Sequence, residues 1–182
     1  MAIRLSDNRC EEIKNIVVDT FVRLNICCVP ISGFEIVKKL GVKTIPYSSQ
    51  TEETRQLMML YSEDGFTIKH DGLWYIFYND EKSYGRTNNT LIHESAHIVL
   101  NHTEESDLAE AEANFFAKYA IAPPVLIHKL GLKDCNDVYD RFDISFEAAI
   151  YAYNYYRKWL TCGNKFYTDY ELRLLGLFNE AV

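Results

Sequence analysis

The chain has 182 residues, of which 48% are hydrophobic and 14% aromatic, so a disordered chain is excluded and a sizeable core is expected. Its net charge of -7 argues against direct binding of DNA, because phosphate contacts need a basic surface. No apolar run approaches the roughly 18 residues of a membrane span, and the N-terminus lacks an export signal. Five cysteines without regular spacing are typical of free thiols, which predicts a cytoplasmic protein.

The first half of the chain predicts two helices and a small sheet. Ser6 or Asp7 can cap a helix that ends at residue 24, and a short helix is predicted over residues 32–40. Residues 42–47 alternate weakly, as a strand does. The β-rich stretches 65–70 and 73–78 are joined by Asp71-Gly72, which predicts a hairpin because both residues tolerate positive φ.

His93, Glu94 and His97 form an HExxH pattern in a predicted helix over residues 90–101. Residues four apart share one face of a helix, so both imidazoles can turn toward one ion while Glu94 lies beside any water on it. This arrangement is typical of metal-assisted hydrolysis. Because the pattern also occurs by chance, it remains a hypothesis that a third ligand has to support.

The third ligand is predicted on the next helix, residues 106–121. One face of this helix combines small and polar residues, namely Glu110, Ala113, Asn114 and Ala117. Small residues allow close approach to the histidines, so Glu110 can reach the ion, and Asn114 can hydrogen-bond a ligand. Glu112 points elsewhere and is not favoured. The alternative is that these acids form a solvated face.

Four further helices are predicted toward the C-terminus. Pro123-Pro124 ends one element and opens a short helix to residue 130, and another helix covers residues 133–141. Ser145 caps a helix to about residue 160, and the last helix spans residues 169–180.

Two histidines outside the motif have a structural interpretation. His102 follows His97 by five residues, so on a continuing helix it points about 140° away, and a surface or supporting role is favoured over a ligand. His128 follows the Pro-Pro pair and could stabilise a transition state, although a lone histidine is more often structural.

The motifs resemble those of the ImmA/IrrE family of bacterial and phage zinc metallopeptidases. That family's pattern has an Arg before HExxH, an apolar run ending in His, and then E-x-x-A-N-x-F-A and a Pro. This chain meets the pattern in order and spacing, with Arg86, His102, residues 110–117 and Pro123. The resemblance covers about residues 30–160. Ala120-Ile121-Ala122 departs from the family's Leu-Leu-Met, which alters the expected wall of the pocket.

The predicted fold class is α+β, mostly helical, with a small three-stranded sheet and a zincin-like HExxH helix. No linker or repeat divides the chain, so a single metallopeptidase domain is expected over residues 1–182. Residues 1–41 would hold the N-terminal helices, residues 42–130 the sheet and metal-binding helices, and residues 131–182 the C-terminal helices.

The resemblance implies a zinc-dependent endopeptidase whose substrate is a helix-turn-helix transcriptional repressor of a phage, a mobile element or a stress response. His93, His97 and Glu110 would hold Zn2+, although these ligands also suit Mn or Fe. Glu94 would take a proton from the coordinated water as general base and return it to the leaving amine. A protein substrate is thus expected, with no direct nucleic-acid or membrane partner.

Substrate is expected to bind as an added strand beside residues 73–78, because zincin-like peptidases place the strand before the metal helix at the sheet edge along the cleft. These residues are unusually apolar for an edge. An inner strand packed on both faces is therefore an equally weighted alternative.

A second reading of the chain is a non-catalytic regulatory protein that docks a repressor or antitoxin without turnover. Glu94 argues against it, since a purely structural zinc has four protein ligands and needs no general base. A structural domain with a chance HExxH is the weakest reading.

Overall fold

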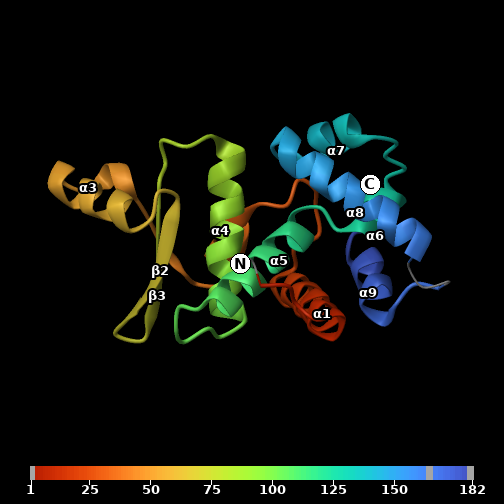
Figure 1. Cartoon of the computed structure of the whole chain (residues 1–182), viewed down its shortest axis with the longest axis horizontal. Helices are drawn as coiled ribbons and strands as arrows, with labels where there is room; N and C mark the ends of the chain where they lie inside the picture. The colour runs from red at the N-terminus through yellow and green to blue at the C-terminus, as the bar shows by residue number, and fades with distance from the viewer. Residues whose placement is uncertain (1–2, 163–165, 180–182) are drawn as a thin grey trace.

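Helices form most of the molecule, and a small sheet stands at one end of it (Figure 1). The computed structural model of the chain describes residues 3–162 and 166–179. In these residues the elements follow in the order α1 (Asp7–Leu24), α2 (Gly33–Lys39), β1 (Lys43–Pro46), η1 (Tyr47–Ser49), α3 (Glu52–Tyr61), β2 (Gly65–His70), β3 (Leu73–Tyr78), α4 (Tyr84–Val99), α5 (Asp107–Ile121), α6 (Pro124–Lys129), α7 (Cys135–Phe142), α8 (Phe146–Cys162) and α9 (Asp169–Leu177). The predicted α+β class is confirmed. None of the described helices is long and apolar enough to cross a membrane.

The sheet has the strand order β1-β3-β2, with β1 parallel and β2 antiparallel to β3. The hairpin turn is as predicted, because Asp71 and Gly72 have φ angles of 49° and 78°. The placement of residues 73–78 at the sheet edge is wrong, since β3 is the central strand. β3 has paired neighbours on both sides, but only Ile76 of it is buried and Leu73 is exposed, so it is an inner strand whose faces are only partly covered. The edge strand of the hairpin is β2.

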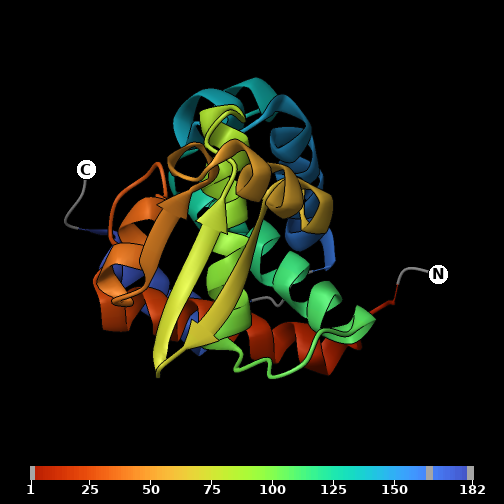
Figure 2. The same cartoon turned by 90° about the vertical axis from the view of Figure 1, so that its left-hand side faces the viewer.

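Helix α4 packs across one face of the sheet, which Figure 2 shows lying in front of it. Ile76 of β3 is fully buried there together with Leu91 of α4, and Val37 and Val42 complete this small cluster. The sheet therefore fixes the position of the helix that bears the HExxH motif.

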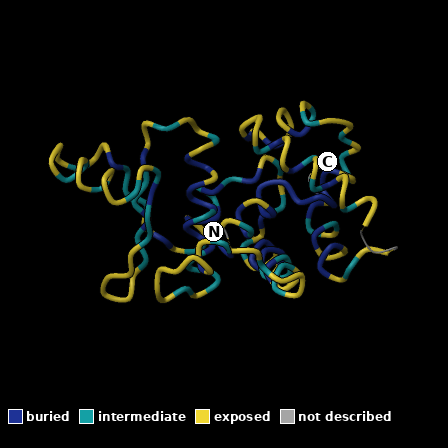
Figure 3. Tube along the Cα trace, in the orientation of Figure 1, coloured by how far each residue is buried: buried dark blue, intermediate teal, exposed yellow. Residues whose placement is uncertain are grey.

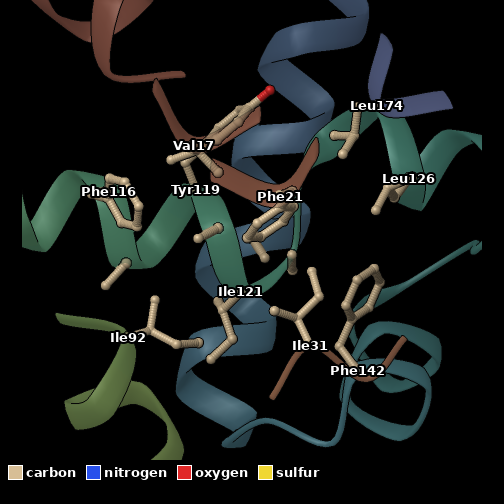
Figure 4. Packing of buried hydrophobic residues seen from close by; sticks show 14 of the residues in the cluster. Val17, Phe21, Ile31, Ile92, Phe116, Tyr119, Ile121, Leu126, Phe142 and Leu174 are labelled. Atoms are coloured by element: carbon tan, nitrogen blue, oxygen red, sulfur yellow. The ribbon is translucent and has the colours of Figure 1, made fainter. Parts of the chain in front are cut away.

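The main core lies on the other side of α4, where α1, α5 and the C-terminal helices meet (Figure 3). Phe21 of α1, Ile92 of α4 and Phe116 of α5 are fully buried in it (Figure 4). Ile92 directly precedes His93 on α4 and is fully buried, so it anchors the helix in this core next to the first histidine of the motif.

Helix α3 was not predicted, and it extends away from the sheet with no buried residue (Figure 1). Local contacts support it, because the Thr51 hydroxyl accepts a hydrogen bond from the Thr54 amide and Glu52 pairs with Arg55, which also pairs with Glu81. Its apolar residues are mostly exposed and do not pack into a core, namely Leu57, Met59, Leu60 and Tyr61.

The helix of the HExxH motif begins earlier and ends earlier than predicted. It starts at Tyr84 and ends at Val99, and Asn101 turns the chain with a left-handed φ of 56°. Most other predicted helices agree within two residues. The predicted end of the last helix, Glu180, lies outside the described residues, and α9 ends at Leu177.

Gly33 is the contact point between α2 and α4, and an added methyl group there is expected to destabilise the fold. A Cβ at this position would lie 2.6 Å from the Asn88 carbonyl oxygen and 2.9 Å from the Leu91 Cβ. Gly33→Ala should lower the free energy of unfolding by about 1–3 kcal/mol, as overpacking does. Gly176→Ala on α9 is the matched control, because its Cβ would meet nothing within 4 Å and alanine favours a helix. Urea unfolding of both variants measures the difference, and an unaffected Gly33→Ala would contradict this packing.

Candidate metal centre

The two histidines of the HExxH motif lie one turn apart on α4 and face the same point. Their Nε2 atoms are 3.2 Å apart, and both side chains are mostly buried. As the sequence predicts, the helical spacing brings both imidazole nitrogens together.

Glu110 reaches the same point from α5, the helix that packs closely against α4. Ala113 and Ala117 are buried on its inner side, as predicted. The Glu110 carboxylate places Oε2 3.4 Å from His93 Nε2 and Oε1 3.2 Å from His97 Nε2. Three potential ligand atoms therefore meet in one place.

The spacing of these atoms suits a tetrahedral metal ion. Nitrogen and oxygen ligands lie about 2.0–2.2 Å from zinc, so neighbouring corners of its tetrahedron are about 3.3 Å apart. The separations found here, 3.2 to 3.4 Å, agree with that value. His93, His97 and Glu110 could thus hold a metal ion.

Burial keeps the two imidazoles in the neutral form that a metal requires. It lowers the pKa of His93 to about 4, and burial together with the charge of His93 lowers the pKa of His97 to about 4. A depressed histidine pKa favours the neutral ring at every pH above it. No proton then has to be displaced from these rings at neutral pH.

Glu94 is buried near His93, His97 and Glu110 but is not one of the three potential ligands. Its Oε2 accepts a hydrogen bond of 2.7 Å from the Thr67 hydroxyl of β2. Burial raises the pKa of Glu94 to about 7, and the negative charge of Glu110 adds to this effect. A carboxyl group whose pKa lies near neutrality is suited to taking up and returning a proton.

A cleft of about 390 Å³ opens beside these side chains. Thr67 and Lys69 of β2 and Trp74 of β3 form one wall, and the loop between α4 and α5 forms the other. Glu94, His97 and Glu110 also line this cleft.

Comparison with protein families gives one match, to the IrrE N-terminal-like domain of the M78 peptidases, over residues 37–154. This match spans well over half of the chain. The chain belongs to the M78 peptidase family. Neither curated proteins nor solved structures gave a match. The predicted resemblance to ImmA/IrrE is confirmed, and membership of a peptidase family implies a protein substrate and suggests a metal cofactor.

His102, which ends the apolar run of the family pattern, lies elsewhere than predicted. Since α4 ends at Val99, the chain folds back and places His102 Nδ1 3.0 Å from His97 Nδ1. The predicted angle of 140° assumed a helix that continues. The expectation that His102 supports the site and is not itself a ligand agrees with this contact.

Glu112 points away from the ligand atoms, as predicted, but it is not solvated. It is 7% exposed and lies between His102 and Arg9 of α1. Sequence analysis missed Arg9, because 103 positions separate it from Glu112 and no local pattern links them.

Asn114 and His128 do not contact the ligands in the way the sequence suggested. The Asn114 amide donates to the backbone carbonyl of Glu110, not to its carboxylate. His128 bonds the Tyr156 hydroxyl and is not among the residues that line the cleft. Neither side chain therefore stabilises a charge in the cleft of this structure.

Proposed function

We propose that the chain is a zinc-dependent endopeptidase that cleaves a helix-turn-helix transcriptional repressor. The observation that supports the metal is the triangle of His93, His97 and Glu110, whose spacing suits zinc. The repressor as substrate rests on the resemblance to the ImmA/IrrE peptidases. Free thiols at all five cysteines support the cytoplasmic location that such a substrate requires.

The mechanism needs one proton acceptor beside the metal ligands, and Glu94 has that place. His93, His97 and Glu110 would hold the zinc, which when bound acts as a Lewis acid toward a water molecule and the scissile carbonyl. Glu94 takes the proton released from the attacking water and returns it to the leaving nitrogen. The Thr67 hydroxyl donates to Oε2 of Glu94, which fixes the carboxylate and leaves Oε1 for the proton.

The substrate is proposed to bind along the free edge of β2, not along β3. In a ladder closed by a two-residue turn, the pairs His70–Leu73 and Ile68–Tyr75 are hydrogen-bonded and the pairs between them are not. The backbone groups of Thr67 and Lys69 therefore point away from β3. Both residues line the cleft together with Glu94, His97 and Glu110, so an extended peptide can add to this edge beside them.

Lys69→Pro is expected to lower cleavage while the protein still folds. Proline removes the backbone N–H that faces the cleft, and an edge strand tolerates this loss. Lys69→Ala is the matched control, because it removes the side chain and keeps the N–H. Ile68→Pro, in contrast, removes a donor to β3 and should disrupt the hairpin. Peptide hydrolysis and circular dichroism are measured for all three, and equal cleavage by Lys69→Pro and Lys69→Ala would exclude binding along β2.

The repressor proposal is tested with the zinc-loaded protein and the helix-turn-helix repressor encoded beside it. Mass spectrometry of the mixture should find two fragments whose masses sum to the repressor plus one water. An intact repressor, under conditions in which a generic peptide library is cut, would refute the substrate but not the peptidase. An intact library as well would refute the peptidase.

A further inference from the structure

We propose that Arg9, Glu112 and His102 position the metal ligand His97 through a chain of hydrogen bonds that starts on the N-terminal helix. We call these three residues the Arg9 chain. The inference rests on the proposed metal centre. None of the three is among the grouped ligand atoms, so each is a positioning residue.

The first link fixes the ring of His97. Its Nε2 atom faces His93 and Glu110, and it must hold a free lone pair to bind a metal. In the neutral ring the proton then resides on Nδ1, which lies 3.0 Å from Nδ1 of His102. His97 therefore donates to His102, and this contact selects the tautomer that can bind metal.

The second link fixes His102. Since its Nδ1 accepts from His97, its own proton is on Nε2, which lies 3.1 Å from Oε2 of Glu112. The backbone supports this orientation, because the His102 amide donates to the His97 carbonyl after the left-handed turn at Asn101. Both hydrogen bonds thus run in one direction, from His97 to His102 and from His102 to Glu112.

The third link holds the carboxylate of Glu112. Arg9 donates from Nε to Oε1 at 2.7 Å and from Nη2 to Oε2 at 2.8 Å. Such a two-point contact fixes the plane of a carboxylate as well as its position. Glu112 is buried, so without Arg9 its charge would lack its main partner.

The Arg9 chain makes α1 a part of the metal centre, although α1 lies outside the residues that the family model matches, 37–154. The helix is anchored in the main core through Phe21 and brings Arg9 to the outer side of α5. The position of a ligand in the matched domain therefore depends on a segment beyond it.

The test compares Arg9→Met with Glu12→Gln. Glu12 also pairs with Arg9, at 2.8 Å, but it is exposed and is not part of the chain, so its loss is the matched control. Zinc affinity is measured by competition with a chelator. Arg9→Met and His102→Ala should each weaken zinc binding about 10- to 100-fold, as losses of such supporting partners do. Glu12→Gln should bind zinc as the native protein does.

Two further readouts separate positioning from folding. Imidazole nitrogen shifts of the metal-free protein should show His97 protonated at Nδ1, and Arg9→Met should shift part of the population to the other tautomer. A double variant that combines Arg9→Met with His102→Ala should bind zinc no more weakly than His102→Ala alone, because Arg9 acts through His102. Arg9→Lys keeps the charge without the two-point contact, so it should lose less affinity than Arg9→Met.

Native zinc affinity and an unchanged His97 tautomer in folded Arg9→Met would overturn the proposal, even if its thermal stability fell. Additive losses in the double variant would overturn it as well. A native protein that binds zinc tightly but cuts no substrate would refute the proposed function and leave the Arg9 chain intact. A native protein that binds no zinc would refute both.

Discussion

Glu94→Gln is expected to bind zinc and fold like the native protein, and to cleave substrate at least about a hundredfold more slowly. The amide cannot take a proton from the attacking water, and loss of a general base typically costs 10²–10⁴ in rate. Glutamine has almost the same shape and can still accept the hydrogen bond from Thr67. The change therefore removes the proton acceptor and little else. Initial rates of peptide hydrolysis at equal zinc loading measure the effect.

The control for this variant is Glu104→Gln, which removes one negative charge from the loop that lines the same cleft. The rate of peptide hydrolysis by Glu104→Gln should change far less than that by Glu94→Gln. A Glu94→Gln protein that still derepresses target genes in a cell-based reporter would favour the non-catalytic alternative, in which the protein acts by docking a repressor. Loss of derepression together with loss of cleavage would favour the peptidase.

The environment of Glu94 also predicts how the rate depends on pH. Burial raises the pKa of this carboxyl to about 7, so the deprotonated form that acts as a base is lost as the pH falls through that value. Positive charge from a bound metal would lower this pKa. The acidic limb of the pH–rate profile should therefore lie at or below pH 7, and it should disappear in Glu94→Gln.

The sequence could predict the grouping of His93, His97 and Glu110 because most of its signal is local. His93 and His97 are one helical turn apart, and Glu110 shares a face with two small residues that allow close packing of α5 on α4. The hairpin was equally accessible, since Asp71-Gly72 specifies its own turn. The turn and the pair of histidines need only a few neighbouring residues, whereas Glu110 also needs α5 to pack on α4.

What the sequence could not predict depends on contacts between distant segments. The pairing of β1 with β3 makes β3 a central strand, and nothing within residues 73–78 distinguishes that outcome from an apolar edge. His102 contacts His97 only because α4 ends at Val99, a boundary that spacing rules place to within a few residues. Arg9 reaches Glu112 from another helix, which only the folded chain brings near.

The proposed metal ligands give the second large expected effect: His93→Ala, His97→Ala and Glu110→Ala should each abolish stoichiometric zinc binding. A site with three protein ligands keeps one position open for water, so none of the three is dispensable. The protein purified without chelator should contain close to one zinc, and each variant close to none, by elemental analysis. Zinc stabilises only a fold that binds it, so added zinc should raise the melting temperature of the native protein alone.

Glu112→Gln separates the ligand assignment from a simple count of carboxylates near the site. Glu112 lies two positions from Glu110 but turns its carboxylate to Arg9 and His102. Its variant should still load one zinc at saturation, with lower affinity, whereas Glu110→Ala should not. The metal-free native protein is the reference for stability, because each ligand variant should unfold at a similar temperature. A zinc-loaded Glu110→Ala together with an empty Glu112→Gln would reverse the two roles and refute the helical-face argument from which Glu110 was assigned.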